Sequence, residues 1–209
     1  MFIQTLPQSA QAILAKLGRQ QWMRNFYLAG GSAAALHLGH RISEDLDFFN
    51  PKEFNARLLL QKLARIGKFD LQTEAWGTLT GAFEGVRVSF FTYPYPLLEP
   101  ATKLFGVKIA SLVDIGLMKL VAISQRGSRR SFADLFFICR SAVSLETLIS
   151  LLPQKFAGIN YNLPHILRSL VYFDDAEKEP MPKMLVRLRW VDVKRFFQSE
   201  VKRIAQANL

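Results

Sequence analysis

The order of elements between residues 25 and 50 limits how this chain can fold more than any other feature. A short apolar run, NFYLA, is typical of a buried strand. It leads through Gly30–Ser32 into a short apolar helix and then into DLDFFN, which again has strand character. Side chains two residues apart on a strand point to the same side, so we expect Asp45 and Asp47 to project together while Leu46 faces a core. The two carboxylates should therefore lie on a strand beside the first one, facing the glycine turn.

The same order predicts chemistry. Gly30 and Gly31 would let the backbone approach a phosphate group closely, and Ser32 is expected to be the N-cap of a helix that ends at Gly39. Free N–H groups at such a helix start favour an anion. Two nearby carboxylates repel each other unless a cation lies between them, and hard oxygen ligands suit Mg²⁺, with Mn²⁺ as the alternative. Each motif by itself is commonly structural, but the combination favours a phosphate- and metal-binding site.

The rest of the sequence predicts an α+β fold, with a mixed sheet flanked by helices and then a C-terminal helical part. Glu84-Gly85 has hairpin chemistry, while the prolines of Tyr93–Pro100 exclude regular structure there. We place the change near residue 105, giving parts 1–105 and 106–209 that could share one core. The other expected elements are a helix over Pro51–Ile66, strands Thr78–Phe83 and Val86–Phe91, and helices Asp114–Gln125, Ser131–Arg140, Leu145–Leu152, Pro164–Phe173 and Leu185–Ala207.

The net charge of +10 is concentrated in two segments. Residues 101–140 hold seven Lys or Arg against two Asp, and residues 181–209 hold seven against one Asp and one Glu. Each segment therefore carries +5, and the remainder sums to zero. Two basic segments on a balanced chain indicate a polyanionic partner, either a nucleoside triphosphate or nucleic acid. Solvated helix faces explain the charge equally well.

The cysteine count and the hydropathy pattern indicate a cytoplasmic protein. The single cysteine, Cys139, excludes an intramolecular disulfide and a zinc site built on cysteine pairs. No stretch approaches the roughly 20 apolar residues of a membrane span. The first residues also lack the basic and apolar regions of a secretory signal. We therefore expect the cytoplasm as the location, and no membrane partner.

The string GGSAAALHLGHRISEDLDFF (Gly30–Phe49) resembles the first motif of the abortive-infection nucleotidyltransferase toxins of the AbiEii/AbiGii type. The resemblance covers most of the chain. It implies a polymerase-β-like nucleotidyltransferase fold, a nucleoside triphosphate substrate and Mg²⁺. It also implies a toxin of a bacterial toxin–antitoxin or phage-defence system, with a cognate antitoxin, that transfers a nucleotide to RNA or protein. The other matching stretches are SFFTYPYPLLEP (Ser89–Pro100), ASLVDIGLMKLVAISQRGSRRSFADLFFI (Ala110–Ile138) and YFDDAEKEPMPKM (Tyr172–Met184).

The resemblance also assigns roles to single residues. It makes Asp45 and Asp47 the metal ligands and Asp134 a further active-site acid. It assigns contacts with the triphosphate to Gly31, Ser32, Lys119 and Arg126.

The residues themselves leave alternatives open. Lys119 and Arg126 are seven residues apart on one expected helical face, which suits either phosphate contact or two surface cations. Ser131 and Asp134 form a capping-box-like pattern, so Asp134 also has a structural explanation. Further nucleotide-binding candidates are Gly30, Arg41 and Ser43; Arg41 could instead pair with Asp45 or Asp47.

Two positions depart from the family pattern. A polymerase-β-type centre usually has a third carboxylate on a later strand, where this chain has Ser89, and the pattern favours Asp where this chain has Ser131. The leading hypothesis is a Mg²⁺-dependent nucleotidyltransferase that moves a nucleotide to a hydroxyl of a tRNA-like RNA or of a protein. The alternatives are a catalytically degenerate relative that only binds nucleotide or RNA, and an interaction protein whose partner covers the basic C-terminal helix.

Overall fold

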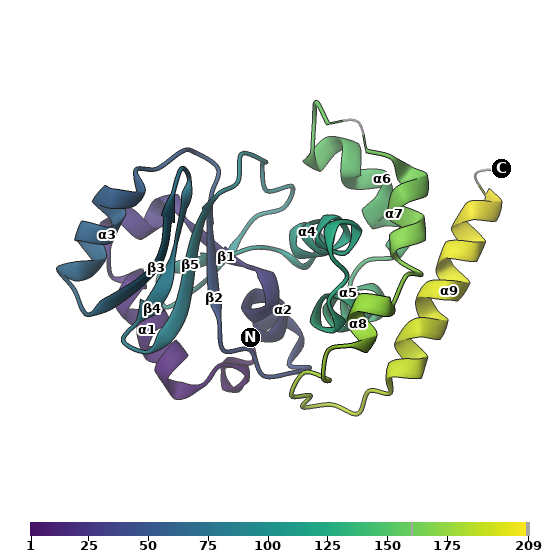
Figure 1. Ribbon diagram of the computed structural model, residues 1–209, viewed down its shortest axis with the longest axis horizontal. Helices are drawn as coiled ribbons and strands as arrows, with labels where there is room; N and C mark the ends of the chain where they lie inside the picture. The colour runs from purple at the N-terminus through teal and green to yellow at the C-terminus, as the bar shows by residue number, and fades with distance from the viewer. Residues whose placement is uncertain (160, 208–209) are drawn as a thin grey trace.

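The computed structural model describes residues 1–159 and 161–207, and Figure 1 shows a sheet on one side of the molecule and a helical part on the other. Helices α1 and α3 cover one face of the sheet, and α2 lies on the other face, next to the helical part. The sheet is mixed and has the strand order β3-β4-β5-β2-β1-β7-β6. Its strands are β1 (Tyr27–Ala29), β2 (Leu46–Asn50), β3 (Phe69–Ala75), β4 (Thr78–Phe83), β5 (Val86–Thr92), β6 (Thr102–Leu104) and β7 (Val107–Ile109).

Helices and strands alternate from α1 to β3, strands β3 to β7 then follow one another, and the described elements after β7 are all helices. Buried apolar side chains of both regions form one cluster, which includes Phe48 of β2 and Leu117 of α4. The expected α+β class is therefore confirmed. The helices are α1 (Gln8–Gly18), α2 (Gly30–Leu38), α3 (Ala56–Ala64), α4 (Leu112–Gln125), α5 (Arg129–Ser141), α6 (Leu145–Lys155), α7 (Leu163–Ser169), α8 (Asp174–Glu177) and α9 (Trp190–Ala207).

The region around the glycine turn folds as its sequence predicts. Strand β2 pairs antiparallel with β1, and Ala29 lies opposite Asp47. Along β2 the side chains alternate, so Leu46 and Phe48 are buried in the core while Asp47 points to the other face. Helix α2 ends at Gly39, whose φ of 67° is left-handed. The hairpin of β4 and β5 is also confirmed.

The sequence does not predict β3, β6 or β7. Strand β3 lies at the edge of the sheet, and all of its side chains except Phe69 are exposed, so the apolar alternation that signals a strand is missing. Strands β6 and β7 have three residues each. Such short runs carry too few side chains for a recognisable period.

The expected boundary near residue 105 falls on the turn of the β6–β7 hairpin. Phe105 and Gly106 form this turn, both with positive φ. Strand β7 then pairs in parallel with β1, so the sheet extends to Ile109 and the uninterrupted helices begin at α4. The division into parts 1–105 and 106–209 stays a prediction.

The end of the chain returns to the loop before β2. The expected helix over Pro164–Phe173 is α7, which ends at Ser169; the short helix α8 that follows was not expected. The C-terminal helix begins at Trp190 rather than at Leu185. In the segment before α9, the Lys183 carbonyl accepts from Ile42 N at 2.8 Å, and Leu185 N donates to the His40 carbonyl at 2.9 Å. The C-terminal segment therefore holds the loop that leads into β2.

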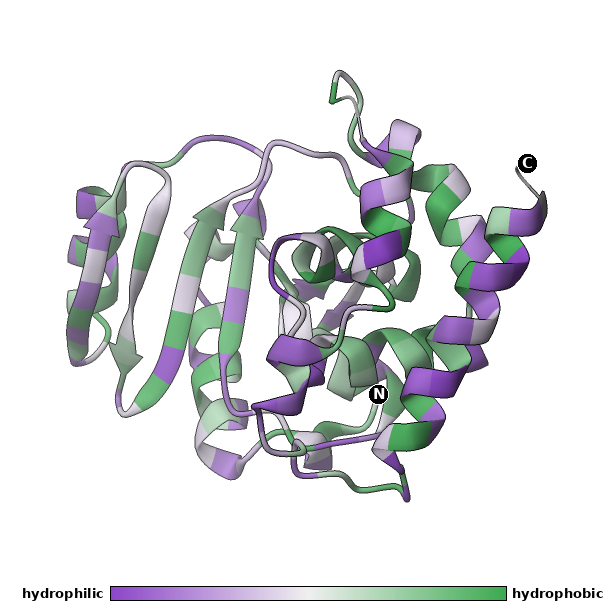
Figure 2. Ribbon diagram, turned by 45° about the vertical axis from the view of Figure 1, so that its right-hand side comes forward, coloured by the Kyte–Doolittle hydropathy of each residue, from purple (hydrophilic) through white to green (hydrophobic). Residues whose placement is uncertain are grey.

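Among the described residues, no single helix has the length and hydropathy of a membrane span. Helices α5 and α6 meet such a criterion only together, as a pair bent by 107°. Figure 2 shows hydrophilic and hydrophobic residues interspersed along the C-terminal helix α9, as is usual for a helix with one face on a core.

Candidate active site

Asp45 and Asp47 line one polar hollow of about 140 Å³ between the sheet and the helical part. Asp47 is on β2, and Asp45 immediately precedes this strand. The expected strand position next to β1 is therefore confirmed for Asp47, while Asp45 lies one residue before the strand and lines the same hollow. Other residues that line the hollow are Gly31, Arg41, Ser43, Lys119, Ser128, Arg130 and Ser131.

The surroundings of Asp47 disfavour its negative charge. Burial raises the pKa of its carboxyl group, and the charge of Asp45 raises it further. The Ser89 hydroxyl and the charges of Lys119 and Arg130 oppose this shift but do not cancel it. A cation between the two carboxylates would relieve the repulsion, so this pair fits a hard divalent metal ion.

Ser89 lies beside Asp47, at the position where the resemblance to the family predicts a third carboxylate. The two residues are partners in the parallel register of β2 and β5, and the Ser89 hydroxyl acts to lower the pKa of the Asp47 carboxyl group. Ser89 is buried. Within the described part of the chain, no three His, Cys, Asp or Glu side chains gather into a metal site. The structure therefore offers two carboxylates at this point, with a hydroxyl in the third position.

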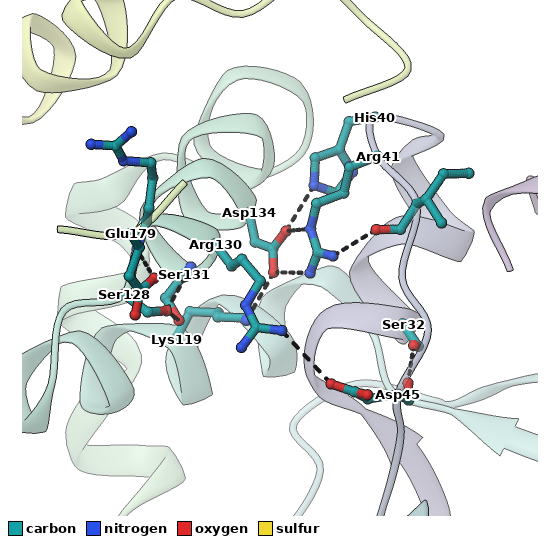
Figure 3. Close-up of polar contacts among 12 residues, drawn as sticks. Ser32, His40, Arg41, Asp45, Lys119, Ser128, Arg130, Ser131, Asp134 and Glu179 are labelled. Atoms are coloured by element: carbon teal, nitrogen blue, oxygen red, sulfur yellow. Dashed lines mark hydrogen bonds and ion pairs between the residues drawn. The ribbon is translucent and has the colours of Figure 1, made fainter. Parts of the chain in front are cut away.

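Asp134 forms ion pairs with two cations that line the hollow, Arg41 and Lys119 (Figure 3). Its fully buried carboxylate accepts from Arg41 Nε at 2.7 Å and Nη2 at 3.0 Å, and it pairs with Lys119 Nζ at 2.8 Å. His40 Nε2 lies 2.8 Å from Oδ1. Burial acts to raise the pKa of Asp134, but Lys119, Arg41 and His40 hold it well below its ordinary value. Asp134 is therefore a charged anchor that positions Arg41 and Lys119.

The capping explanation for Asp134 is wrong. Ser128 is the N-cap of α5, and its hydroxyl accepts from Ser131 N at 3.2 Å. Asp134 lies further along the helix and bonds side chains, not the first N–H groups. Arg41 likewise pairs with Asp134 rather than with Asp45 or Asp47.

The two glycines are needed for close approach of other side chains. Gly30 has a φ of +67°, and a Cβ there would lie 3.0 Å from Asp47 Oδ2. A Cβ on Gly31 would clash with Arg41 Nη2. Ser32 is not the N-cap, since α2 begins at Gly30 after Ala29; its hydroxyl donates to the Asp45 carbonyl instead. Ser32 thereby connects α2 to the residue that starts the carboxylate pair.

Arg130, and not the expected Arg126, lines the polar hollow together with Lys119. Helix α4 ends at Gln125, so Arg126 is outside the helical face of Lys119; it is exposed and does not line the hollow. Arg130 lines it, with Nη1 3.7 Å from Asp45 Oδ2. The i, i+4 spacing of Arg130 and Asp134 on one helix could have indicated this residue.

An apolar hollow of about 480 Å³ adjoins the polar one, and Lys119 lines both. Its walls include Phe49 of β2 and the tyrosines of the segment after β5. The rings of Tyr93 and Tyr95 lie 4.8 Å apart, and Tyr95 is 4.9 Å from Phe156. Sequence reasoning identified this segment only as irregular.

A buried ion pair fixes this aromatic wall. Lys155 Nζ lies 2.7 Å from Asp114 Oδ1, both side chains are fully buried, and Lys155 also donates to the Pro96 carbonyl at 2.6 Å. Asp114 accepts from Leu98 N at 2.9 Å and from Glu99 N at 3.2 Å. The segment that carries the tyrosines is therefore tied to α4 and α6.

Comparisons with known proteins agree with this architecture. A family model described as nucleotidyl transferase AbiEii toxin of a type IV toxin–antitoxin system matches residues 12–96. An uncharacterized protein of Aquifex aeolicus is 38% identical over 183 residues, which are 85% of this chain and 87% of that protein. Two solved structures share the fold. MenT4, a nucleotidyltransferase toxin from Mycobacterium tuberculosis, matches with a TM-score of 0.59 at 13% identity, over 91% of this chain and 81% of its own. JHP933 from Helicobacter pylori matches with a TM-score of 0.54 at 17% sequence identity, over 97% of this chain and 96% of its own.

Proposed function

Since this chain belongs to the AbiEii family of nucleotidyltransferase toxins of type IV toxin–antitoxin systems, we propose that it is a Mg²⁺-dependent enzyme that moves a nucleotide from a nucleoside triphosphate to a hydroxyl of RNA. A tRNA-like molecule is the proposed acceptor, and a protein hydroxyl is the second candidate. The observation that carries the proposal is the polar hollow, where two carboxylates face Lys119 and Arg130. We place the reaction in the cytoplasm. The family implies a cognate antitoxin as partner.

Asp45 and Asp47 would hold the metal ion. Their mutual repulsion, expressed in the raised pKa of Asp47, supports this assignment. Mg²⁺ accepts two carboxylates and retains several waters, so a site without a third acid is adequate for one ion; Mn²⁺ is the alternative. When bound, the ion would supply positive charge to the phosphates and the leaving group.

Cations and backbone groups around the hollow would hold the triphosphate. Helix α2 starts at Gly30, beside the carboxylates, so its free N–H groups suit a phosphate there. Lys119, Arg41 and Arg130 contribute three positive charges to the same hollow, and Ser43 a hydroxyl. The adjoining aromatic hollow would take the nucleoside, because its tyrosine and phenylalanine rings can stack on a base.

The protein would act mainly by positioning and by neutralising charge. A bond forms between the acceptor oxygen and the α-phosphorus, the bond from that phosphorus to the bridging oxygen breaks, and pyrophosphate leaves. The proton of the acceptor hydroxyl would pass to solvent water, because both carboxylates of the hollow are assigned to the metal ion. Lys119 and Arg41, fixed by Asp134, would keep the triphosphate oriented without reorganisation during the reaction.

A transfer assay tests the proposal. The purified protein is incubated with Mg²⁺, total RNA and each nucleoside triphosphate in turn, labelled on its α-phosphate. We expect label in RNA with at least one triphosphate and loss of labelling when EDTA is added. Label that survives ribonuclease and disappears with protease would identify a protein acceptor. No labelled product with any of the four triphosphates would contradict the proposal.

Ser89 gives a sharper test of the metal site. We expect Ser89→Asp to lower the Mg²⁺ concentration needed for half-maximal transfer, because a third carboxylate beside Asp47 adds negative charge to the metal site. The measurement is a Mg²⁺ titration of the transfer rate. Thr80→Asp is the matched control, since Thr80 pairs with Ser89 but lies one strand further from Asp47. If both variants shift the titration equally, the effect is general charge and Ser89 is not at the metal.

A further inference from the structure

A separate hollow of about 450 Å³ lies on the other face of the sheet from the carboxylate pair. Asn50 and Leu59 line it, and Asn50 points away from the face that carries Asp47, because the side chains of β2 alternate. It is bounded by the segments before β1 and after β2, by α3 and by β7. None of its lining residues belongs to the polar or the aromatic hollow described above. It is therefore a distinct place on the molecule.

Four cations surround this hollow: Arg24, Lys52, Lys62 and Lys108. All four are exposed, and in the described ranges 1–159 and 161–207 none of them forms an ion pair. Among the residues that line the hollow, Glu53 contributes a negative charge against these four positive ones. The Lys108 ammonium donates to the Arg24 carbonyl at 2.8 Å, which fixes one cation at the rim. The hollow is therefore positively charged.

The basic C-terminal helix, by contrast, uses much of its charge internally. Lys194 Nζ lies 2.7 Å from Glu177, and Arg203 lies 2.8 Å from Glu146 and 3.0 Å from Glu200. Charges that are already paired attract a polyanion less than free ones do. The unpaired cluster around the hollow is accordingly the stronger candidate for nucleic acid, although it lies outside both basic segments of the sequence except for Lys108.

Aromatic and amide side chains accompany these cations. Trp22 and Phe54 are half-buried at the hollow, each packed on a core ring: Trp22 lies 6.4 Å from Phe90, and Phe54 lies 5.3 Å from Phe26. Rings anchored in this way can stack on bases at little entropic cost. The exposed amide of Asn25 can hydrogen-bond base edges, while the amide oxygens of Asn50 and Asn55 already accept from Lys52 N and Leu58 N.

We propose that this hollow binds single-stranded RNA, with the cations on phosphates and with Trp22 stacked on a base. The cations come from four separate elements around the rim, which suits phosphates spaced along a strand better than one compact triphosphate. An acidic protein segment would use the charges but not the rings, so the aromatic residues favour RNA. The proposal concerns binding and is independent of whether the chain transfers nucleotides to RNA.

The first test removes charge from the hollow. A fluorescein-labelled 12-nucleotide RNA is titrated with wild type and with the double variant Lys52→Gln/Lys62→Gln at several salt concentrations. We expect weaker binding by the variant and a slope of log affinity against log salt that is shallower by about 1.4, since each lost single-strand phosphate contact removes roughly 0.7. The matched control is Arg57→Gln/Arg65→Gln, which removes the same charge at exposed positions on and directly after α3 that do not line the hollow. Equal losses in both variants would show diffuse surface attraction and overturn the proposal, as would no loss in either.

The second test reports on the aromatic contact. In a Trp76→Phe/Trp190→Phe background, Trp22 is the remaining tryptophan of the chain. We expect RNA to quench its fluorescence and an oligoglutamate of equal charge to leave it unchanged, with an unaltered melting temperature showing that the background is folded. Binding of both ligands with the same affinity and no quenching would identify an acidic protein as the occupant and contradict the RNA proposal.

Discussion

Asp47→Asn is expected to lower nucleotide transfer by more than about 100-fold while the protein remains folded. The reason is that Asp47 is one of the two carboxylates at the polar hollow, and the loss of groups that merely orient a metal ligand already lowers activity by about 10- to 100-fold. The variant should also lose Mg²⁺-dependent binding of nucleoside triphosphate. The measurements are the labelled transfer assay and a binding titration at fixed Mg²⁺.

The same substitution should make the metal-free protein more stable at neutral pH. The pKa of Asp47 is raised in the folded state, so its ionised form is disfavoured there relative to the unfolded chain. This destabilisation is present above the folded-state pKa and disappears as the pH falls below the ordinary carboxyl value. Urea unfolding should therefore show a larger free energy of unfolding for Asp47→Asn at pH 7 and a smaller difference at acid pH.

Glu44→Gln is the matched control for both measurements. It removes the same charge three residues away, at an exposed position that does not line the hollow. We expect transfer and stability close to wild type. A Glu44 variant as inactive as the Asp47 variant would mean that net charge, and not the carboxylate at the hollow, governs the reaction.

The centre of the site could be predicted from sequence because local geometry determines it. Asp45 and Asp47 share a side through the two-residue period of a strand, and the glycine turn precedes them in the chain by a short helix. The carboxylate pair depends on a few neighbouring residues. The position of Ser89, by contrast, was predicted from the resemblance to the family, and the parallel pairing of β5 with β2 places it beside Asp47 as expected.

Arg41 and Lys119 were expected at the site, but Arg130 was not, because the choice between Arg126 and Arg130 depends on where one helix ends and the next begins. Had α4 continued past Gln125, Arg126 would have shared the face of Lys119; instead the chain turns, and α5 delivers Arg130. The role of Asp134 depends on contacts with residues more than 90 positions away along the chain, such as Arg41. No local pattern carries that information.

The missed strands have a related explanation. Strand β3 is held by the neighbouring β4 through backbone bonds, while its side chains face solvent and so carry no period. For Ser32, the sequence predicts a feature that the structure lacks. Serine is typical of an N-cap, but α2 already begins two residues earlier, at Gly30. In both places tertiary contacts determine the secondary structure, and the intrinsic preference of the residues predicts it poorly.

Asp134→Asn is expected to destabilise the protein by about 3 kcal/mol, because it leaves the buried Arg41 and the half-buried Lys119 without their counter-charge. It should also raise the KM for nucleoside triphosphate, since these cations would lose the group that orients them. Urea unfolding and initial-rate kinetics measure the two effects. Asp192→Asn is the control, because it breaks an exposed pair with Arg189 and should change stability little.

The pH dependence of the free energy of unfolding tests whether the charge of Asp134 is what stabilises the protein. Its pKa is lowered by folding, so the ionised carboxylate stabilises the protein fully above the ordinary carboxyl pKa of about 3.9, and this contribution is lost as the pH falls toward the lowered value. The stability difference between wild type and Asp134→Asn should therefore be constant from about pH 7 to pH 5 and shrink below about pH 4. A difference that persists unchanged in acid would mean that the carboxylate acts through shape and hydrogen bonding, and the assignment of Asp134 as a charged anchor would then be wrong.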